Sequence, residues 1–328
     1  ATDLDPDDQT TVTLKVGADQ AVSGSDVVFV LDKSTSVEVK NEALAMLEEL
    51  KNYASANNYS VKVGLVTFNN NANNTDYNLE LTKLDDTSYN TIETIFGLEK
   101  LTSGTNIEAG IRAGMAMLEG DATVLDTNKH LVLVTDGVAY MWGTEAPQTI
   151  YVELNNTKAA AVDMVNPYYA YRSNNYNAYK DAALWMAAAK EGGIEEVIAQ
   201  YQTDYTVAFG NDVEKYIPAS EECPYSSLEA AVYMAGKAWQ EAADRGYELY
   251  AFSADDYVEK YPWAPNFISG LDTISGTAAL YTDNDNGVAG MFDNVKNTVL
   301  YEIQKGRVID VIGSDFDLTD VSSFTLTV

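Results

Sequence analysis

The stretch DVVFVLDKSTSV, Asp26 to Val37, contains an apolar run that ends in three oxygen-bearing side chains. The run Val27–Leu31 is almost continuously apolar, which is typical of a parallel strand covered on both faces. Asp32, Ser34 and Ser36 follow it at alternating positions. Because side chains alternate along an extended segment, these three converge on one point. The stretch therefore predicts a buried central strand that carries one carboxylate and two hydroxyls at its end.

Short apolar runs of this kind recur along the chain and alternate with helical patterns. Together they predict an α/β fold with a doubly wound, mostly parallel sheet of the Rossmann-like type. The alternating segment Leu79–Leu84 fits an edge strand reached by a hairpin. The other predicted strands are Val61–Phe68, Leu131–Thr135, Tyr247–Ser253 and Thr277–Thr282, and the predicted helices are Val37–Ala56, Ile107–Leu118, Ala178–Glu191, Leu228–Arg245 and Met291–Ile303.

One interruption and two β-like ends modify this arrangement. We predict that residues 26–138 and 226–305 form the α/β domain. The intervening residues 139–225 far exceed an ordinary strand-to-helix loop and predict an inserted subdomain. Residues 1–25 and 306–328 are predicted to be the N- and C-terminal β segments of a second β module.

Composition and charge exclude several classes of partner. The chain of 328 residues has 50 acidic and 20 basic side chains, for a formal net charge of −30. Such a field repels phosphate backbones and anionic lipid surfaces, so no nucleic acid partner is expected. No apolar run approaches the length of a membrane helix, so direct membrane insertion is not expected either. The start ATDLDPDD lacks the features of a signal peptide and suggests a mature fragment, and the lone Cys223 excludes an internal disulfide.

Two further side chains join Asp32 at the carboxyl end of the predicted sheet. Asp136 closes the strand Leu131–Thr135, and Thr105 precedes a predicted helix after the flexible turn at Gly104. Open α/β sheets bind ligands at this end, near the switch in strand order. Hard cations prefer oxygen ligands and readily keep water in their remaining positions. The sequence therefore predicts a divalent-cation site, for Mg²⁺ or alternatively Mn²⁺ or Ca²⁺.

The five oxygen-bearing positions resemble the metal-ion-dependent adhesion site of von Willebrand factor type A domains. That family's pattern is D-x-S-x-S, a Thr in a later loop and an Asp after a central strand. Here it falls on Asp32, Ser34, Ser36, Thr105 and Asp136, and none departs from it. The resemblance implies that an acidic side chain of a protein ligand completes the coordination of the metal. It also implies a binding protein, not an enzyme.

Other interpretations of these residues explain less. Caps of the following helix at Asp32 and Ser36, with a turn at Asp136, account for each residue singly but not for the whole set. A phosphatase with an aspartyl nucleophile needs a second Asp where Ser34 stands. The single histidine, His130, precedes the strand that ends at Asp136 and is expected to lie too far away to act there.

The insertion leaves the sheet directly after Asp136, so its base is expected beside the metal. Its tyrosines, mixed with Asn and Ser, have the composition of an adaptable recognition surface, although they would equally form the core of a small subdomain. A polar loop after the strand Val61–Phe68 is expected at the same end. The candidate ligand contacts are Tyr168, Tyr169, Tyr171, Tyr176, Asn70 and Asn71.

A type A domain with an insertion after its metal strand and β segments on both sides resembles the tip adhesins of Gram-positive pili and related surface proteins. This implies an extracellular location at a bacterial cell surface or pilus tip, a host or matrix protein as ligand, and other domains or pilin subunits as neighbours. Two alternatives remain open at this point. One is a binding subunit of an intracellular or envelope assembly, and the other is a metal-dependent hydrolase.

Overall fold

The computed structural model describes residues 24–34, 39–72, 74–101, 104–145, 150–154, 157–160, 176–204, 206–209, 212–217, 225, 227–253, 261, 263–276, 279–281 and 287–304. Residues 22–303 form one compact unit. Within the described ranges, no helix combines the length and the apolarity needed to cross a bilayer.

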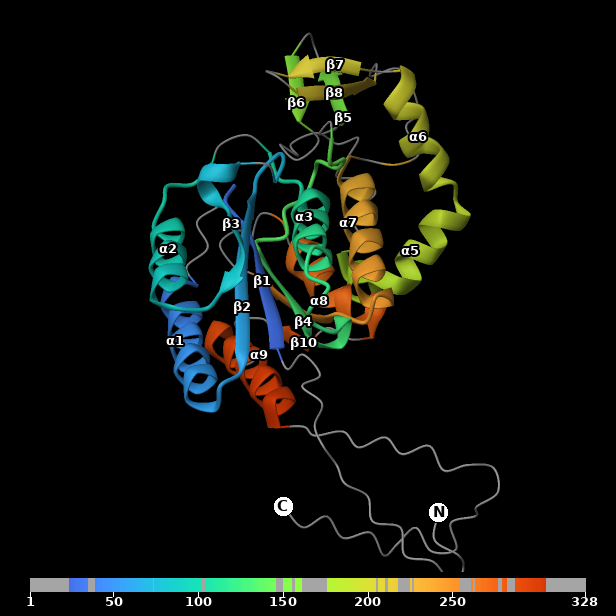
Figure 1. Ribbon diagram of the computed structural model, residues 1–328. Helices are drawn as coiled ribbons and strands as arrows, with labels where there is room; N and C mark the ends of the chain where they lie inside the picture. The colour runs from blue at the N-terminus through green and yellow to red at the C-terminus, as the bar shows by residue number, and fades with distance from the viewer. Residues whose placement is uncertain are drawn as a thin grey trace, which may run out of the picture. The chain divides into compact units, whose positions relative to one another are not determined.

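Five parallel strands and one antiparallel edge strand form the main sheet, in the order β10-β9-β4-β1-β2-β3 (Figure 1). The central strand β1 pairs in parallel with β2 on one side and β4 on the other, so the strand order reverses there. The predicted strands and the predicted edge hairpin are confirmed. The bounds are β1 Gly24–Asp32, β2 Ser60–Phe68, β3 Leu79–Lys83, β4 Lys129–Thr135, β9 Glu248–Ser253 and β10 Ala279–Tyr281.

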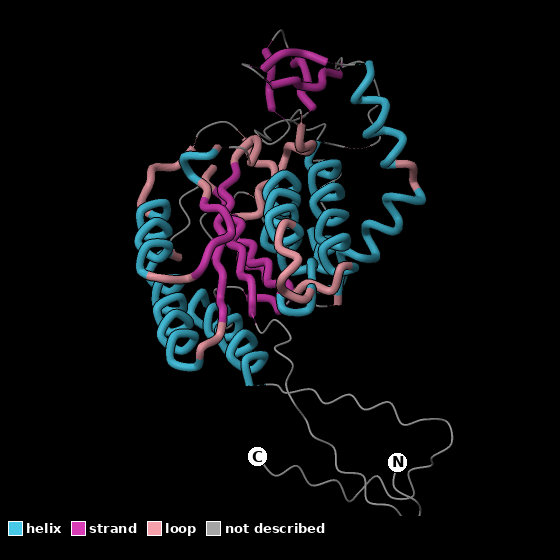
Figure 2. Tube along the Cα trace, in the orientation of Figure 1, coloured by secondary structure: helices cyan, strands magenta, loops and turns pink. Residues whose placement is uncertain are grey.

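Helices cover both faces of this sheet, and the alternation of side chains along β1 divides the core between them (Figure 2). Val28 and Val30 pack with α3, α7 and α8, whereas Val27, Phe29 and Leu31 pack with α1, α2 and α9. The bounds are α1 Lys40–Asn57, α2 Asp86–Phe96, α3 Ile107–Glu119, α7 Ser227–Asp244, α8 Trp263–Ser275 and α9 Gly287–Gln304. Burial on both faces explains why the middle of each of β1, β2 and β4 is almost entirely apolar.

The sequence-based prediction missed three helices, α2, α8 and α6 (Ile194–Asp204). Helix α2 begins with a capping box, in which Asp85 accepts a hydrogen bond from the Ser88 backbone at 3.0 Å and Ser88 Oγ accepts one from the Asp85 backbone at 2.9 Å. Its Thr and Ile side chains are typical of strands, but Ser88, Ile92 and Ile95 are buried at helical spacing. Both the cap and this spacing were therefore available as signals.

The predicted insertion contains more structure than the single helix expected there. A four-stranded sheet has the order β6-β5-β8-β7, and the helices η3, α5 and α6 lie between β6 and β7 in the chain. The bounds are β5 Ile150–Leu154, β6 Thr157–Ala160, η3 Tyr176–Asp181, α5 Ala182–Glu191, β7 Thr206–Phe209 and β8 Asp212–Ile217, with a further short η1 at Thr75–Tyr77 and η2 at Asp126–Asn128 outside the insertion.

Part of the predicted insertion belongs to the core of the main unit. Tyr179, Ala182 and Ala189 are buried in the cluster that also contains α7 and α8, and Ile194 and Ile198 of α6 join it. The helical half of the segment is therefore packed on the sheet-covering helices. The predicted terminal β segments lie outside the described residues, apart from Gly24 and Ser25 at the start of β1, so the domain boundaries stay a prediction.

Helix α3 approaches β1 and β2 closely enough that glycine is required at its contact face. A Cβ atom on Gly110 would lie 2.5 Å from Cδ1 of the buried Phe68 and 2.9 Å from Cγ1 of Val30. We expect Gly110→Ala to lower the free energy of unfolding by about 1–2 kcal/mol, since an overpacking cost of about 1–3 kcal/mol outweighs a helix-propensity gain of up to about 1 kcal/mol. Urea denaturation measures the change.

Gly97 offers the matched control. It ends α2 with φ −80°, and an added Cβ would meet no atom nearer than 3.4 Å. Gly97→Ala should leave the unfolding free energy unchanged or slightly higher. Equal stability of the two variants would contradict the close packing of α3.

Candidate metal centre

The register of β1 and β4 brings two acidic side chains to the carboxyl edge of the sheet. Leu31 pairs with Val134, so Asp32 at the end of β1 lies beside Thr135, and Asp136 follows directly. The strand order reverses at β1, which is the position where open α/β sheets bind ligands. Asp32 and Asp136 are 1% and 6% exposed. Two carboxylates are therefore buried together at the switch point.

Hydrogen bonds fix both oxygens of Asp32. Oδ1 accepts from the Ser34 backbone at 2.9 Å and from Ser34 Oγ at 2.6 Å, while Oδ2 accepts from Thr135 Oγ1 at 2.6 Å. Burial, followed by repulsion from Asp136, nevertheless raises the pKa of Asp32 well above its usual range. The hydrogen bonds hold the carboxylate in place and favour its charged form, but they do not offset the effects of burial and of Asp136 on its pKa.

Two hydroxyls complete the cluster. Ser34 Oγ lies 2.8 Å from Thr105 Oγ1, so the loop after β1 and the loop before α3 meet at this point. The Thr105 carbonyl accepts hydrogen bonds from the backbones of Tyr140 and Met141, which hold the chain after Asp136 against the same loop. Asp136 is shaped locally by a hydrogen bond from the Val138 backbone to its Oδ1 at 2.9 Å. Four of the five predicted ligands thus lie together, and Ser36 falls outside the described residues.

Lys33 turns away from the cluster, as the alternation along the segment predicts. Its ammonium donates to the Leu98 carbonyl at 2.7 Å and the Phe96 carbonyl at 3.3 Å, near the end of α2. Its backbone is also tied on both sides, because its N–H donates to the Phe68 carbonyl and its carbonyl accepts from the Leu101 backbone. The site consequently contains no cation of its own from this segment to balance the two acids.

The residues present fit a hard divalent cation. All donors of the cluster are oxygens, and the repulsion between Asp32 and Asp136 would be relieved by a positive charge between them. The described residues hold no group of three or more His, Cys, Asp or Glu side chains that is placed to bind a metal, so a cation here would be held by two carboxylates together with hydroxyls. That set is suited to Mg²⁺ or another oxygen-preferring ion and poorly suited to Zn²⁺.

The loop after β2 lies at the same edge, as predicted for Asn70 and Asn71. The Asn106 backbone donates to the Asn69 carbonyl at 2.7 Å, and Asn106 Nδ2 donates to the Asn70 carbonyl at 3.0 Å. Gly104 has φ +89° and approaches Asn70 so closely that an added Cβ would lie 3.0 Å from the Cβ of Asn70. Both asparagines are partly exposed.

Asn106 is a site residue that the sequence-based prediction missed. It is fully buried, and its Oδ1 accepts from the Ala109 backbone at 3.0 Å, which caps α3. Its Nδ2 also donates to the Gly143 carbonyl at 2.8 Å, so one side chain joins the loops after β2, before α3 and after β4. The signal available was an Asn at the N-terminus of a predicted helix. Thr135, which holds Asp32, gave no comparable signal.

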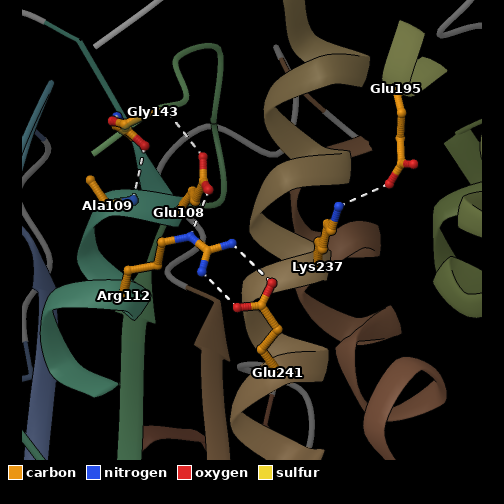
Figure 3. A network of polar contacts seen from close by, with 8 residues as sticks. Glu108, Ala109, Arg112, Gly143, Glu195, Lys237 and Glu241 are labelled. Carbon is orange, nitrogen blue, oxygen red and sulfur yellow. Dashed lines mark hydrogen bonds and ion pairs between the residues drawn. The ribbon is translucent and has the colours of Figure 1, made fainter. Parts of the chain in front are cut away.

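A network of charged groups behind Asn106 anchors the same loops (Figure 3). Glu108 is 3% exposed and accepts from the Gly143 backbone at 2.9 Å and from Arg112 Nε at 2.7 Å. Arg112 also donates to both oxygens of Glu241 on α7, at 2.7 and 3.1 Å, and this holds the pKa of Glu241 below its usual value. A separate ion pair links Lys237 on α7 to Glu195 on α6 at 2.9 Å. The chain after Asp136 is therefore tied to two helices.

The predicted tyrosine contacts stay predictions, because the structure does not describe their side chains. Tyr168, Tyr169 and Tyr171 lie outside the described residues, as does Cys223, and only the backbone of Tyr176 is described, in η3. His130 is fully buried early in β4, opposite Val27, and stacks on Tyr250 with 6.2 Å between the ring centroids. Its place six residues before Asp136 confirms that it lies away from the carboxyl edge.

Comparison with known families fits this geometry. Residues 26–185 match the family model of the von Willebrand factor type A domain. The chain contains a von Willebrand factor type A domain. The type A match begins at the start of the β1 apolar run and includes Asp32, Ser34, Thr105 and Asp136. None of the curated proteins searched matches the sequence significantly.

Solved structures with similar folds include three proteins from pili. The pilus adhesin SpaC from Lactobacillus rhamnosus GG is 20% identical with a TM-score of 0.50; 87% of this chain and 31% of SpaC are covered. The PilB minor pilin from Streptococcus sanguinis is 14% identical with a TM-score of 0.50, covering 86% and 62% of the chains. The vWF domain of the type V pili tip protein Mfa5 from Porphyromonas gingivalis is 16% identical with a TM-score of 0.50, covering 88% and 99%. At these identities the likeness establishes the fold.

The network of Figure 3 gives a test of how the site loops are held. Arg112→Ala would leave the buried Glu108 carboxylate without its cation. We expect a loss of about 2–3 kcal/mol of unfolding free energy, less than the about 3–5 kcal/mol for a fully buried pair, because the Arg112 side chain is 29% exposed. Chemical denaturation measures it.

Arg245→Ala is the matched control, since Arg245 pairs with Glu119 at 2.8 Å with both side chains well exposed. Exposed pairs contribute about 0–1 kcal/mol, so this variant should unfold almost like the parent. A loss for Arg112→Ala no larger than for Arg245→Ala would show that the network does not hold the loops.

Proposed function

We propose that this chain is the ligand-binding part of a bacterial adhesin and that it attaches to a host or matrix protein through a divalent cation. The ion, Mg²⁺ or alternatively Mn²⁺ or Ca²⁺, would be held by Asp32, Ser34, Ser36, Thr105 and Asp136. The observation that carries the proposal is the cluster at the switch point, where two buried carboxylates lie with two hydroxyls 2.8 Å apart. The proposed activity is binding, not catalysis.

The chemistry of the cluster supports a bridging role for the ion. Mg²⁺ prefers about six oxygen ligands and retains water in positions that the protein does not fill. A carboxylate from a partner can replace one of those waters, which joins two proteins through the metal. The side chains of this chain bind and orient the ion, and Asn70 and Asn71 in the neighbouring loop are the proposed partner contacts among described residues. Tyr168, Tyr169, Tyr171 and Tyr176 remain proposed contacts from sequence.

The fold supports the location we propose. The similar structures are described as a pilus adhesin, a minor pilin and a pilus tip protein, and the chain spans about a third of SpaC. We therefore propose a place at a bacterial cell surface or pilus tip, in a Gram-positive organism, with other domains or pilin subunits as neighbours. The acidic surface, with a net charge of −30, suits an extracellular protein but does not select it.

Cation binding should stabilise the protein through this site. An ion that binds only the folded chain adds about 2.7 kcal/mol at a free concentration of about 100 times its Kd. We expect the midpoint of thermal unfolding to rise when EDTA is replaced by Mg²⁺ or Mn²⁺. In Asp32→Ala this rise should disappear, because the carboxylate that orients Ser34 is removed. Thermal unfolding with and without the ion measures both effects.

Asp293→Ala controls for nonspecific binding of cations to an acidic surface. Asp293 lies on α9 with a side chain 66% exposed, so its removal also lowers the negative charge by one. This variant should keep the full stabilisation by Mg²⁺. An equal loss in the two variants would mean that the cation acts through the overall charge and not through the cluster.

Attachment itself should depend on the same ion. In a panel of immobilised matrix proteins, the parent chain and Asp293→Ala should bind in Mg²⁺ and release in EDTA, whereas Asp32→Ala should bind at least about tenfold more weakly, the loss of about 1.4 kcal/mol. Circular dichroism confirms that Asp32→Ala is folded. Binding that survives both the mutation and EDTA would refute the metal bridge while leaving the type A fold intact.

A further inference from the structure

Lys33 stands in the chain between two of the proposed cation ligands, Asp32 and Ser34, yet its ammonium is buried elsewhere. The residue is 7% exposed, and its Nζ donates to the Leu98 carbonyl at 2.7 Å and to the Phe96 carbonyl at 3.3 Å. Burial lowers the pKa of this ammonium, and no acid in the described part of the chain opposes the shift. Because a charge buried without a counter-charge costs free energy, these two hydrogen bonds have to compensate for it.

The acceptors of Lys33 lie at the C-terminal end of α2. The helix ends at Phe96, and the Gly97 backbone closes its last turn by donating to carbonyls within the helix. The Phe96 carbonyl is among those that a helix leaves without an intrahelical partner, and the negative end of the helix dipole favours a cation there. The Lys33 ammonium therefore caps this end of α2 and is stabilised by it.

The backbone of Lys33 is fixed on both sides as well. Its N–H donates to the Phe68 carbonyl at 2.8 Å, which extends the pairing of β1 with β2 beyond Asp32. Its carbonyl accepts a hydrogen bond from the Leu101 N–H at 2.7 Å. Side chain and backbone together connect the segment from Asp32 to Ser34 with the end of β2, with α2 and with the chain that follows α2.

We propose that Lys33 is a positioning residue of the cation site. It fixes the loop that carries Asp32 and Ser34, so that their oxygens keep the separation that a small cation requires. This role rests on the proposed function, because it requires that these residues bind a divalent ion. A lysine that only capped α2 would need the two side-chain hydrogen bonds, but not a place directly between two ligands with its backbone tied at both ends.

A fixed loop favours Mg²⁺ over Ca²⁺. Mg²⁺ demands nearly ideal octahedral geometry with oxygens at about 2.0–2.1 Å, whereas Ca²⁺ accepts about six to eight oxygens at about 2.3–2.6 Å in a flexible arrangement. Ser34 Oγ lies 2.6 Å from Asp32 Oδ1 and 2.8 Å from Thr105 Oγ1, so these oxygens are closely packed. Release of the loop would let them separate and accommodate the larger ion. Lys33 thus acts on the choice of ion without contacting it.

Calorimetric titration with Mg²⁺ and, separately, with Ca²⁺ tests this role. Lys33→Met keeps an unbranched side chain but removes the ammonium. Residues that orient metal ligands affect affinity by about 10–100-fold, so we expect Mg²⁺ to bind Lys33→Met about tenfold more weakly than the parent and Ca²⁺ to lose less than about threefold. Lys33→Gln can still donate to one carbonyl and should show a smaller change in the same direction. It is measured in parallel, so the comparison does not depend on the folding of Lys33→Met.

Amide hydrogen exchange in EDTA reports the same role without any ion. The Leu101 N–H donates to the Lys33 carbonyl, and the Ser34 N–H donates to Asp32 Oδ1 at 2.9 Å. Both amides should exchange several-fold faster in Lys33→Met than in the parent, because the loop opens locally, while amides in the middle of β1 keep their protection. Unchanged exchange at both positions in the folded variants would show that Lys33 does not hold the loop.

Lys51→Met is the matched control, because it also removes one positive charge beside α2. The Lys51 side chain is 17% exposed and pairs with Glu48 at 2.7 Å and with Asp86, at the start of that helix, at 2.8 Å. This variant should keep the affinities of the parent for both ions and its exchange rates at Ser34 and Leu101.

The outcomes separate this role from the proposed function. Folded Lys33→Met and Lys33→Gln chains that bind both ions like the parent would overturn the role of Lys33 and leave the cation site intact. An equal loss for Mg²⁺ and Ca²⁺, or the same loss in Lys51→Met, would also overturn it, because the effect would then be general. A parent chain that binds neither ion would overturn the proposed function, and the role of Lys33 with it.

Discussion

The parallel pairing of β1 with β4 is the constraint on which the rest of the molecule depends. Because Leu31 lies opposite Val134, both strands end at one edge and their terminal acids, Asp32 and Asp136, are buried together. Like charges repel strongly at low effective dielectric. Ser34 and Thr135 donate hydrogen bonds to Asp32, and the Val138 backbone donates one to Asp136, which partly stabilises the two charges. A shift of one residue would turn Asp32 to the opposite face of the sheet. One register thus determines both the core and the site.

The site is held from behind by helices that lie far apart in the sequence. Asn106 and Glu108 bind the backbone of Gly143, and Arg112 carries this contact across to Glu241 on α7. The loop that follows Asp136 is therefore connected to helices from both sides of the long segment between residues 139 and 225. These contacts fix the chain on both sides of the long segment, next to Thr105 and Asp136.

The sequence predicts those features that local chemistry determines. Burial on both faces makes the parallel strands apolar, polar side chains after the strands mark Asp32, Ser34 and Asp136, and a polar side chain before a predicted helix marks Thr105. Thr135 could not be predicted in its role, because its partner Asp32 lies 103 residues away and only the strand register brings them together. The four strands of the small sheet contain only four to six residues each and mix polar with apolar positions, so no period identifies them. The position of Asn106 before a predicted helix indicates a helix cap, but the sequence does not show that its side chain also connects the loops after β2 and after β4.

Strand β1 carries a buried acid at each end of the same face, and the neighbours of each acid decide its chemistry. Asp26 and Asp32 are six residues apart and flank Val28 and Val30, so the alternation of the strand turns both toward the α3 side. Asp32 meets a second carboxylate and hydroxyls, a surrounding that favours an added cation. Asp26 instead meets lysines, one of them already joined to a second acid, a surrounding in which the cation is supplied by the chain itself. The same residue type in the same strand therefore has a second carboxylate as its neighbour at one end and lysines as its neighbours at the other.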